Sequence, residues 1–138
     1  MLDIASPKPR ASRPIAVASW TAVVGWMGVI FYLSSRTGIT VWNPMSYVAH
    51  FMEYTILGVL LCAALYCSTS LSGRALLIVA LVIASAYGIS DEFHQSFVPT
   101  REVSVWDWLT DTAGASAALL VWTGMVRARA GKGPLSGV

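Results

Sequence analysis

The chain has 138 residues, of which 56% are hydrophobic and only 12% are charged, and its formal net charge is +2. Soluble domains carry about 25% charged residues, and a chain this short could not hide so much apolar surface from water. The composition therefore excludes an ordinary soluble domain, makes the lipid bilayer the main solvent, and gives no indication of nucleic-acid binding.

Charged residues divide the sequence into four uncharged runs, which we interpret as membrane helices. The runs cover residues 14–35, 54–73, 75–90 and 112–126. About 20 helical residues are needed to cross the hydrocarbon core, so the last two runs must recruit polar flanking residues. The sequence thus predicts an all-α polytopic membrane protein, a bundle of four transmembrane helices with short loops. Cys62 and Cys67 lie inside the second run and are predicted to be packing residues rather than a disulfide.

We expect one membrane domain over residues 14–128, between disordered cytoplasmic tails at 1–13 and 129–138. With four crossings, both tails and the loop after the second helix share one side of the membrane. That side carries seven of the nine basic residues, whereas the other carries Arg36 and Arg101. The seven are Lys8, Arg10, Arg13, Arg74, Arg127, Arg129 and Lys132. The positive-inside rule therefore predicts that both termini are cytoplasmic.

The acidic residues and histidines gather on the opposite, outer face in this topology. Only Asp3 of the seven acidic residues lies elsewhere. The others are Glu53, Asp91, Glu92, Glu102, Asp107 and Asp111, together with His50 and His94. Charged side chains in a membrane are costly and are functional by default, so this clustering predicts a site.

Residues three and four apart share one face of a helix, and three such stripes carry the clustered residues. They are His50 with Glu53 and Tyr54, Asp91 with His94 and Gln95, and Asp107 with Asp111 and Gly114. If the three stripes face one another, they form a polar pocket at the outer end of the bundle. Arg36 and Arg101 are then the cations available to cover it.

Simpler interpretations stay open for several of these residues. Ser104 and Asp107 have the spacing of a capping box, which is compatible with a site role for Asp107. Glu92 and Glu102 could be solvated charges, and Tyr54 and Tyr87 could be packing residues with polar tips. The remaining candidates of this kind are Trp42, Trp106 and Trp108 as interfacial aromatic residues, and Gly114 with Ala118 as a small-residue packing surface.

At these positions the sequence resembles the VanZ-like family of bacterial membrane proteins. The most specific part is an Asp-Glu-x-x-Gln block followed by Pro-x-Arg. The matching residues are His50 to Tyr54 with Leu57 and Gly58; Tyr87 to Gln95 with Phe97 to Pro99 and Arg101; and Ser104, Asp107 and Gly114. They span about residues 47–118. The resemblance implies a multi-pass protein of the bacterial cytoplasmic membrane, in a family whose founding members are linked to resistance against the glycopeptide teicoplanin.

The chain departs from the family pattern at two positions. Asp111 stands where the family usually has Asn, and Tyr47 stands where it often has Lys. The extra carboxylate and the missing cation favour either a bound divalent cation or a protonated carboxyl group. Asp91, Asp107 and Asp111 are the candidate metal ligands. Oxygen ligands alone suit Mg²⁺ or Mn²⁺, and an added histidine would allow zinc.

Three functional hypotheses follow, in addition to a purely structural role in tying helix ends together. The first is an enzyme acting on a lipid-linked or cell-wall substrate, in which a metal or an acid–base pair activates water. Its candidate catalytic residues are His50, Glu53, Asp91, Glu92, Gln95, Arg101 and Asp107. Its candidate substrate-binding residues are Tyr54, Tyr87, His94, Ser104 and Arg36. The second is a non-catalytic protein that binds a lipid or an antibiotic. The third, an ion-coupled transporter, is disfavoured by the small number of short helices unless the protein forms oligomers.

Overall fold

The computed structural model describes residues 11–36, 44–99, 101 and 103–130, and this part of the chain is entirely helical apart from turns and loops. Its four helices are α1 (Arg13–Ser34), α2 (Pro44–Ser68), α3 (Gly73–Gln95) and α4 (Val105–Ala130). The all-α prediction is confirmed. Three of the helices, α1, α2 and α3, are long and apolar enough to cross a membrane. The fourth is the longest, with 26 residues, but its charged residues at both ends make it less apolar.

The last three helices are longer than the uncharged runs that predicted them, because polar residues at the run ends continue the helix, whereas α1 has the same 22-residue length as its run. The largest extension at one end is in α2, which begins at Pro44, ten residues before the second run. The extension places His50 and Glu53 inside the helix. Backbone groups within a bilayer must bond internally, and this requirement favours continued helix over an early loop.

The helix starts show local sequence features that explain them. A proline lies in the first turn of α1, where the missing N–H has no helical partner. Gly73 opens α3 at a φ of +52°, a left-handed conformation that favours glycine. At the start of α4, the Asp107 backbone N–H donates to the Ser104 hydroxyl at 3.3 Å. This bond confirms that Ser104 caps the helix.

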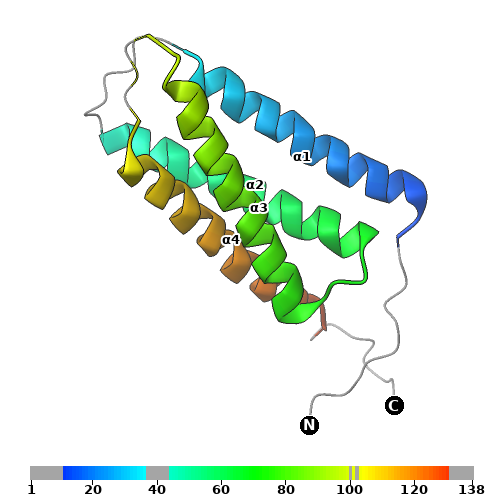
Figure 1. Ribbon diagram of the computed structural model, residues 1–138. Coiled ribbons are helices and arrows are strands. Elements are labelled where there is room, and N and C mark those ends of the chain that lie inside the picture. Colours follow the sequence, from blue (N-terminus) through cyan, green and yellow to red (C-terminus); the bar gives the residue numbers. More distant parts are fainter. Residues whose placement is uncertain (1–10, 37–43, 100, 102, 131–138) are drawn as a thin grey trace, which may run out of the picture.

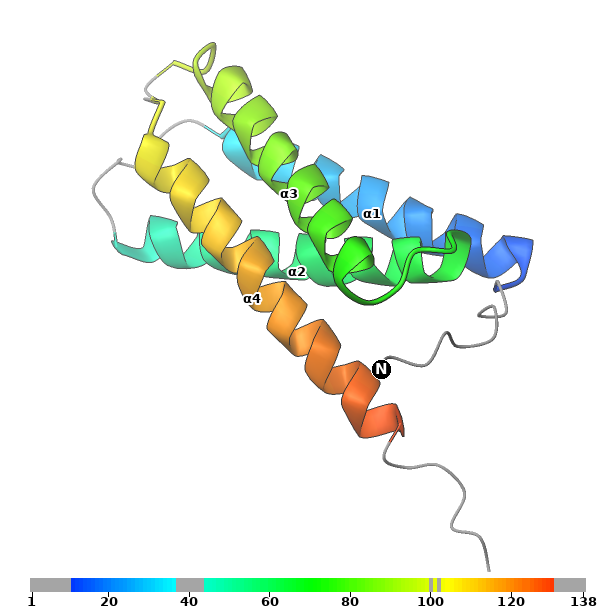
Figure 2. The same cartoon turned by 60° about the horizontal axis from the view of Figure 1, so that its bottom comes forward.

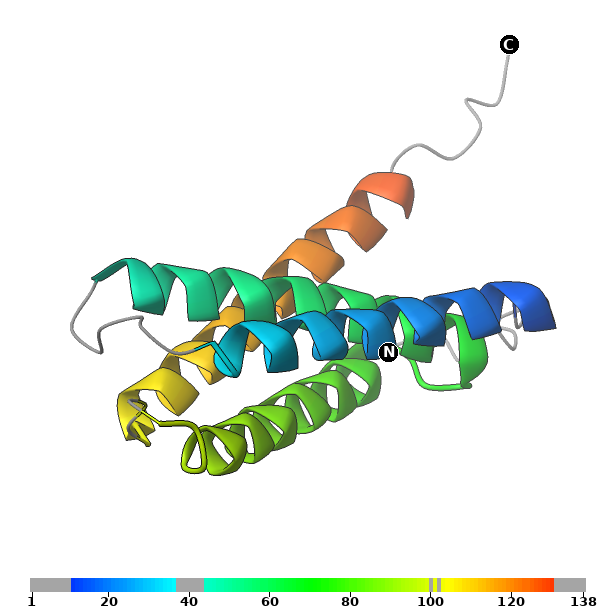
Figure 3. The same cartoon turned by 90° about the horizontal axis from the view of Figure 1, so that it is seen from above.

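The helices run in alternating directions, so that two sets of ends gather at opposite ends of the bundle (Figure 1). One end holds the last residues of α1 and α3 and the first residues of α2 and α4. The other holds the remaining four ends. Figures 2 and 3 show that the last turns of α4 diverge from α1 and α2. The bundle is therefore tightest toward the start of α4, near the predicted polar site.

Glycines allow α2 and α4 to approach each other closely. A Cβ on Gly58 would lie 2.6 Å from the Ala118 Cβ, and one on Gly114 would collide with the Phe51 backbone. The Thr55 hydroxyl donates to the Gly114 carbonyl at 3.0 Å across this contact. These contacts confirm that Gly114 and Ala118 form a small-residue packing surface.

Only three side chains of α1 are buried, Val23, Ile30 and Ser34. Hydrogen bonds supplement this limited packing. The Trp26 indole donates to the Glu53 carbonyl at 2.9 Å, and the Tyr87 hydroxyl donates to the Met27 carbonyl at 2.7 Å. The rotation of α1 is therefore set largely by polar contacts with α2 and α3.

The structure also bears on the predicted domain limits and on the cysteines. The first helix begins at Arg13, and the last continues to Ala130, two residues beyond the expected end of the membrane domain. Most of the expected tails, residues 1–10 and 131–138, lies outside the described residues. Residues 11 and 12 are described and precede α1. Both cysteines are free, and Cys62 is buried, as the packing interpretation predicts.

Candidate functional site

The central contact of the site joins α2 to α4. His50 Nδ1 lies 3.0 Å from Asp111 Oδ1, and the Asp111 side chain is completely buried. An ionised carboxylate can only accept a hydrogen bond, so Nδ1 carries a proton whenever Asp111 is ionised. In the neutral ring the lone pair then lies on Nε2. This arrangement fixes the tautomer and orientation of the imidazole and leaves Nε2 to act on a ligand.

A second buried carboxylate joins α3 to α1. Asp91 Oδ2 accepts hydrogen bonds from the Ser34 hydroxyl at 2.8 Å and from the Gln95 side-chain amide at 3.0 Å. Asp91, Gln95 and Ser34 are all buried. Because Asp91 uses donors from two helices, it holds the end of α1 against the end of α3. Its contacts are those of a residue that positions the wall of a site.

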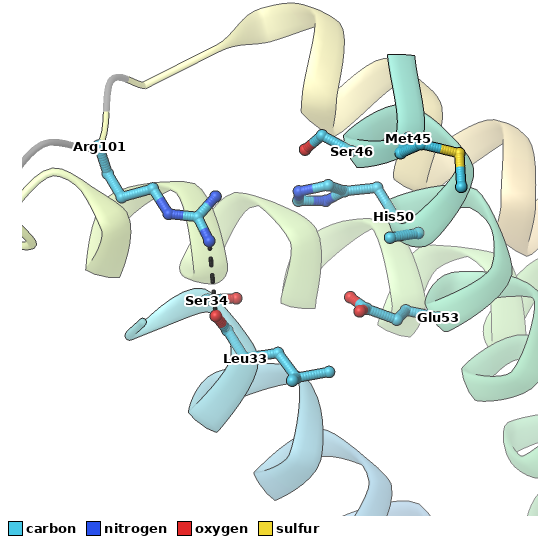
Figure 4. Close-up of a pocket in the computed structure, with 8 residues that line it drawn as sticks. Leu33, Ser34, Met45, Ser46, His50, Glu53 and Arg101 are labelled. Atoms are coloured by element: carbon cyan, nitrogen blue, oxygen red, sulfur yellow. Dashed lines mark hydrogen bonds between the residues drawn. The ribbon is translucent and has the colours of Figure 1, made fainter. Parts of the chain in front are cut away.

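A pocket of about 280 Å³ opens beside these two carboxylates, between the end of α1 and the start of α2. It is lined by Leu33, Ser34, Met45, Ser46, Ala49, His50, Glu53 and Arg101. Figure 4 shows the His50 ring and the Glu53 carboxylate pointing from α2 toward the Arg101 guanidinium on the opposite wall. The pocket thus presents an imidazole, a carboxylate and a guanidinium to one space, beside apolar side chains.

Arg101 reaches the pocket from the segment between α3 and α4. Its guanidinium donates to the Leu33 carbonyl at 3.4 Å, a long hydrogen bond to the end of α1. Among the described residues, Arg101 makes no ion pair with a carboxylate. The guanidinium keeps donors for an anionic group, and Arg is well suited to bind carboxylate or phosphate with two parallel hydrogen bonds.

Glu92 and Ser104 connect the end of α3 to the start of α4 rather than line the pocket. Glu92 Oε2 accepts a hydrogen bond from the Ser104 backbone N–H at 2.8 Å. The Asp107 side chain is half-buried one turn before Asp111. These three residues therefore lie around the segment that carries Arg101. Of their predicted roles, only helix capping by Ser104 has a direct contact among the described residues.

Of the residues predicted to be catalytic, substrate-binding or metal-ligating, only His50, Glu53 and Arg101 line the pocket. The four remaining predicted substrate-binding residues have other contacts. Tyr87 bonds the α1 backbone, and His94 packs against Phe31 with ring centroids 4.1 Å apart. Arg36 is exposed and lies over the Tyr32 ring at 5.9 Å. Tyr54 is fully buried in the bundle core. Glu102 lies outside the described residues. A direct role in contacting a pocket ligand is therefore not supported for these four.

Several buried polar atoms around the pocket have no hydrogen-bond partner among the described residues. They are Tyr54 Oη, Asp91 Oδ1, Glu92 Oε1, His94 Nδ1, Arg101 Nε and Asp111 Oδ2. Buried polar atoms in proteins are normally satisfied by protein, water or ligand. Their concentration at this end of the bundle distinguishes it from a simple packing contact between helix ends.

The carboxylates do not converge in the way that the metal-site interpretation requires. In the part of the chain that the structure describes, no group of three or more His, Cys, Asp or Glu side chains is placed to hold a metal ion. Asp111 bonds His50, whereas Asp91 bonds Ser34 and Gln95. The arrangement of Asp91, Asp107 and Asp111 thus does not support a shared metal centre.

Sequence reasoning missed the contribution of α1 and the first turns of α2. Ser34, Ser46 and Ala49 line the pocket, but none of them is charged. Ser34 lies at the end of a 22-residue helix whose only charged residue is Arg13, at the opposite end, so the search for ionisable residues passed over it. The only sequence feature that could have indicated this residue is its position. It is a serine near the end of the first run, at the outer membrane face where the acidic residues are predicted.

Comparison with known proteins agrees with the motif resemblance. The family model described as VanZ/LLP1 matches residues 19–127. The chain belongs to the VanZ family. The match extends from α1 to the last turns of α4, so both sides of the pocket lie inside the VanZ region. No curated protein and no solved structure matches the chain. This VanZ protein is accordingly a multi-pass membrane protein, and three of its helices are long and apolar enough to cross the membrane.

Proposed function

We propose that this VanZ-family protein binds the anionic head group of a lipid-linked or cell-wall ligand in the pocket between α1 and α2, and acts on it with His50 as a general base. The observation that carries the proposal is the Asp111–His50 pair, joined at 3.0 Å, at the edge of a pocket that also contains Arg101. A buried carboxylate that orients an imidazole is an arrangement suited to proton transfer.

The proposal requires the pocket to lie at one surface of the membrane, and we infer that α4 is the fourth crossing. Its 26 residues correspond to about 39 Å of helix, longer than the hydrocarbon core of about 30 Å. Asp107 and Asp111 lie near one end, and Arg127 and Arg129 near the other. With four crossings, the distribution of basic residues supports cytoplasmic termini and an extracytoplasmic pocket in a bacterial cytoplasmic membrane.

The pocket walls suit an amphiphile. Leu33, Met45 and Ala49 supply apolar contacts, whereas Arg101 supplies the cation. Ligand pockets commonly combine apolar walls with a few polar groups that fix orientation. The guanidinium would hold a phosphate or carboxylate of the head group, and the apolar wall would accommodate the adjoining hydrocarbon. Glu53, across the pocket from Arg101 (Figure 4), would accept hydrogen bonds from sugar or amide donors.

In the chemical step, Nε2 of His50 removes a proton from a water molecule or a hydroxyl group. The oxygen forms a bond to the phosphorus or carbonyl carbon of the ligand, and the leaving group departs with its electron pair and takes up the proton from the His50 imidazolium. Asp111 stabilises the imidazolium that forms. Among the described residues, the hydroxyl groups in the pocket wall that could attack the ligand are those of Ser34 and Ser46. The Ser34 hydroxyl donates to Asp91, so we assign the attack to water or to a hydroxyl of the substrate.

A non-catalytic binding protein is the second candidate, and the Ser34–Asp91 hydrogen bond favours it. This bond engages a pocket hydroxyl in a structural contact and removes the most buried candidate nucleophile. In that case the pocket recognises a lipid or glycopeptide without turnover. Arg101 contributes to binding in both candidates, whereas only the enzyme requires His50 to transfer a proton.

The two candidates separate in one experiment on purified protein in nanodiscs. The probe is a synthetic polyprenyl diphosphate-linked saccharide, with binding measured by native mass spectrometry and products measured by liquid chromatography. We expect Arg101→Gln to lose binding, and His50→Gln to retain binding but lose turnover. Arg36→Gln is the matched control, because Arg36 is an exposed arginine that does not line the pocket. Binding without turnover in the unaltered protein selects the second candidate.

Two further results test the proposal. If the probe does not bind, or if Arg36→Gln weakens binding as much as Arg101→Gln, the pocket is not the binding site. A cellular measurement adds the link to glycopeptides that the family suggests. Cells expressing the protein should show lower susceptibility to teicoplanin than cells expressing the Arg101→Gln variant at equal protein abundance.

A further inference from the structure

A second pocket lies at the other end of the bundle, where α4 diverges from its neighbours (Figures 2 and 3). It measures about 530 Å³ and lies among the end of α2, the start of α3 and the last turns of α4. The residues that the argument uses are Arg74, Leu76, Leu77, Trp122, Val126 and Arg127. None of them belongs to the His50 site, and the proposal made here shares with the proposed function only the inferred membrane orientation.

The polar part of this pocket is positively charged. Arg74 comes from the first turn of α3 and Arg127 from the last turns of α4. The described part of the chain contains no ion pair for either arginine. The positive end of the α3 dipole also lies here, and the Ser72 side chain makes no capping hydrogen bond to the described backbone. Two guanidinium groups and free helix N–H groups therefore border one cavity, and all of them favour an anion.

The remaining wall of the pocket is apolar and aromatic. Leu77 and Val126 line it, and Trp122 forms an edge contact with the Tyr66 ring at a centroid separation of 5.6 Å. A small soluble anion would contact only the arginines and would leave this apolar wall unused. A lipid uses both, because its phosphate meets the charged edge and its acyl chains meet the apolar wall. Tryptophan at a membrane surface commonly lies at the level of the head groups.

We propose that this second pocket binds the phosphate group of an anionic phospholipid, held between Arg74 and Arg127. Basic pockets between transmembrane helices on the cytoplasmic side are suited to anionic lipid head groups. The orientation inferred above places the pocket on that side. The lipid would fill the space between the diverging end of α4 and the start of α3, and would therefore connect two helices that separate from each other there.

The test measures lipid retention by the purified full-length protein. The protein is released into the mass spectrometer from vesicles containing equal amounts of phosphatidylglycerol and phosphatidylcholine with identical acyl chains. We expect preferential retention of phosphatidylglycerol. Each arginine should contribute about fivefold to that preference, so the Arg74→Gln/Arg127→Gln variant should lose about 25-fold. Inorganic phosphate at millimolar concentration, the second arm of the experiment, should not displace the lipid.

The matched control is Arg13→Gln/Arg129→Gln, which removes two charges from the same end of the bundle. Neither Arg13 nor Arg129 lines the pocket, so this variant should keep the preference within about twofold. Equal losses in the two double variants would assign retention to diffuse surface charge and overturn the proposal. Displacement by inorganic phosphate would assign the pocket to a soluble phosphate compound and overturn the lipid assignment.

A charge-preserving variant guards against a folding defect. Arg74→Lys/Arg127→Lys keeps both charges but loses the planar fork of the guanidinium. It should retain most of the phosphatidylglycerol preference and the same elution volume as the unaltered protein. A loss as large as that of the glutamine variant would show that positive charge is not the determinant, and the proposal would fail.

Discussion

His50 on α2 and Asp111 on α4 are 61 residues apart in sequence, and their side chains meet at 3.0 Å. The contact is buried, with 8% of the His50 side chain and none of the Asp111 side chain exposed. The structure therefore uses the same pair both to hold two helices together and to orient the imidazole in the candidate site. The two roles can be separated, because the first affects stability and the second affects the ligand.

Replacing either partner of this pair should destabilise the protein. Loss of one member of a buried hydrogen-bonded pair leaves the other without a partner and costs about 1–3 kcal/mol or more in soluble proteins. Polar contacts within a membrane contribute less, so we expect a coupling free energy of about 1–3 kcal/mol between His50→Leu and Asp111→Leu. Unfolding in mixed micelles with increasing SDS measures the four members of the double-mutant cycle. Strictly additive losses would show that the two side chains do not interact.

Gly114 should tolerate no larger residue, because its Cβ position is occupied by the Phe51 backbone. Gly114→Val forces α2 and α4 apart, and overpacking of this kind costs about 1–3 kcal/mol or more. It should also weaken ligand binding in the His50 pocket by displacing Asp111. Gly124→Ala in the same helix is the control, since nothing lies within 4 Å of its Cβ position. The control should unfold at the same SDS concentration or higher, and equal effects at both sites would refute the close contact.

Ser34→Ala should loosen the end of α1. The variant removes the donor that Asp91 receives from α1 at 2.8 Å, and a hydrogen bond of this kind contributes about 1 kcal/mol. Ser35→Ala is the matching control, because within the described part of the chain the Ser35 hydroxyl bonds only the Phe31 carbonyl of its own helix. We expect faster hydrogen exchange at the end of α1 in Ser34→Ala alone. Equal exchange rates in both variants would indicate that Asp91 does not hold α1.

The two pockets should lie on opposite sides of the membrane. A single cysteine replaces Ser96, at the exposed end of α3, or Arg129, near the end of α4, in a chain whose Cys62 and Cys67 are changed to alanine. A membrane-impermeant maleimide should label position 96 in intact cells and position 129 only after permeabilisation. Labelling of both positions in intact cells would show that α4 does not cross the membrane and that the inferred orientation is wrong.

The helical fold was predictable because its determinants are averages over many residues. Apolar runs of 15 or more residues specify helices whatever their neighbours are. The ends of the helices were predicted less accurately. The uncharged runs stop beside Glu53 and Asp91, whereas the predicted helical stripes, like the structure, place both residues within helices. A bilayer penalises an open backbone more than a polar side chain that has a partner, and this comparison depends on tertiary contacts.

The candidate site was predictable only in part, for a related reason. Helical spacing shows that Asp91, His94 and Gln95 share a face, but it does not give the rotation of that face against the neighbouring helices. Asp91 turns inward and accepts hydrogen bonds from Ser34 and Gln95, whereas His94 packs on Phe31. The sequence predicted only that the stripes carrying His50 and Asp111 would face one pocket. The hydrogen bond between the two side chains depends on the distance between α2 and α4. The close contacts at Gly58 and Gly114 set that distance.

The few buried side chains of α1 have a consequence for how its sequence can vary. Lipid tails contact every side of an apolar helix equally well, so they do not specify which face of α1 meets the bundle. The Trp26, Met27 and Ser34 hydrogen bonds provide that specification. Inserting one residue between positions 27 and 34 would leave hydropathy almost unchanged. It would nevertheless turn Ser34 by about 100°, so that the first wall of the pocket would face hydrocarbon in a helix still able to cross the membrane.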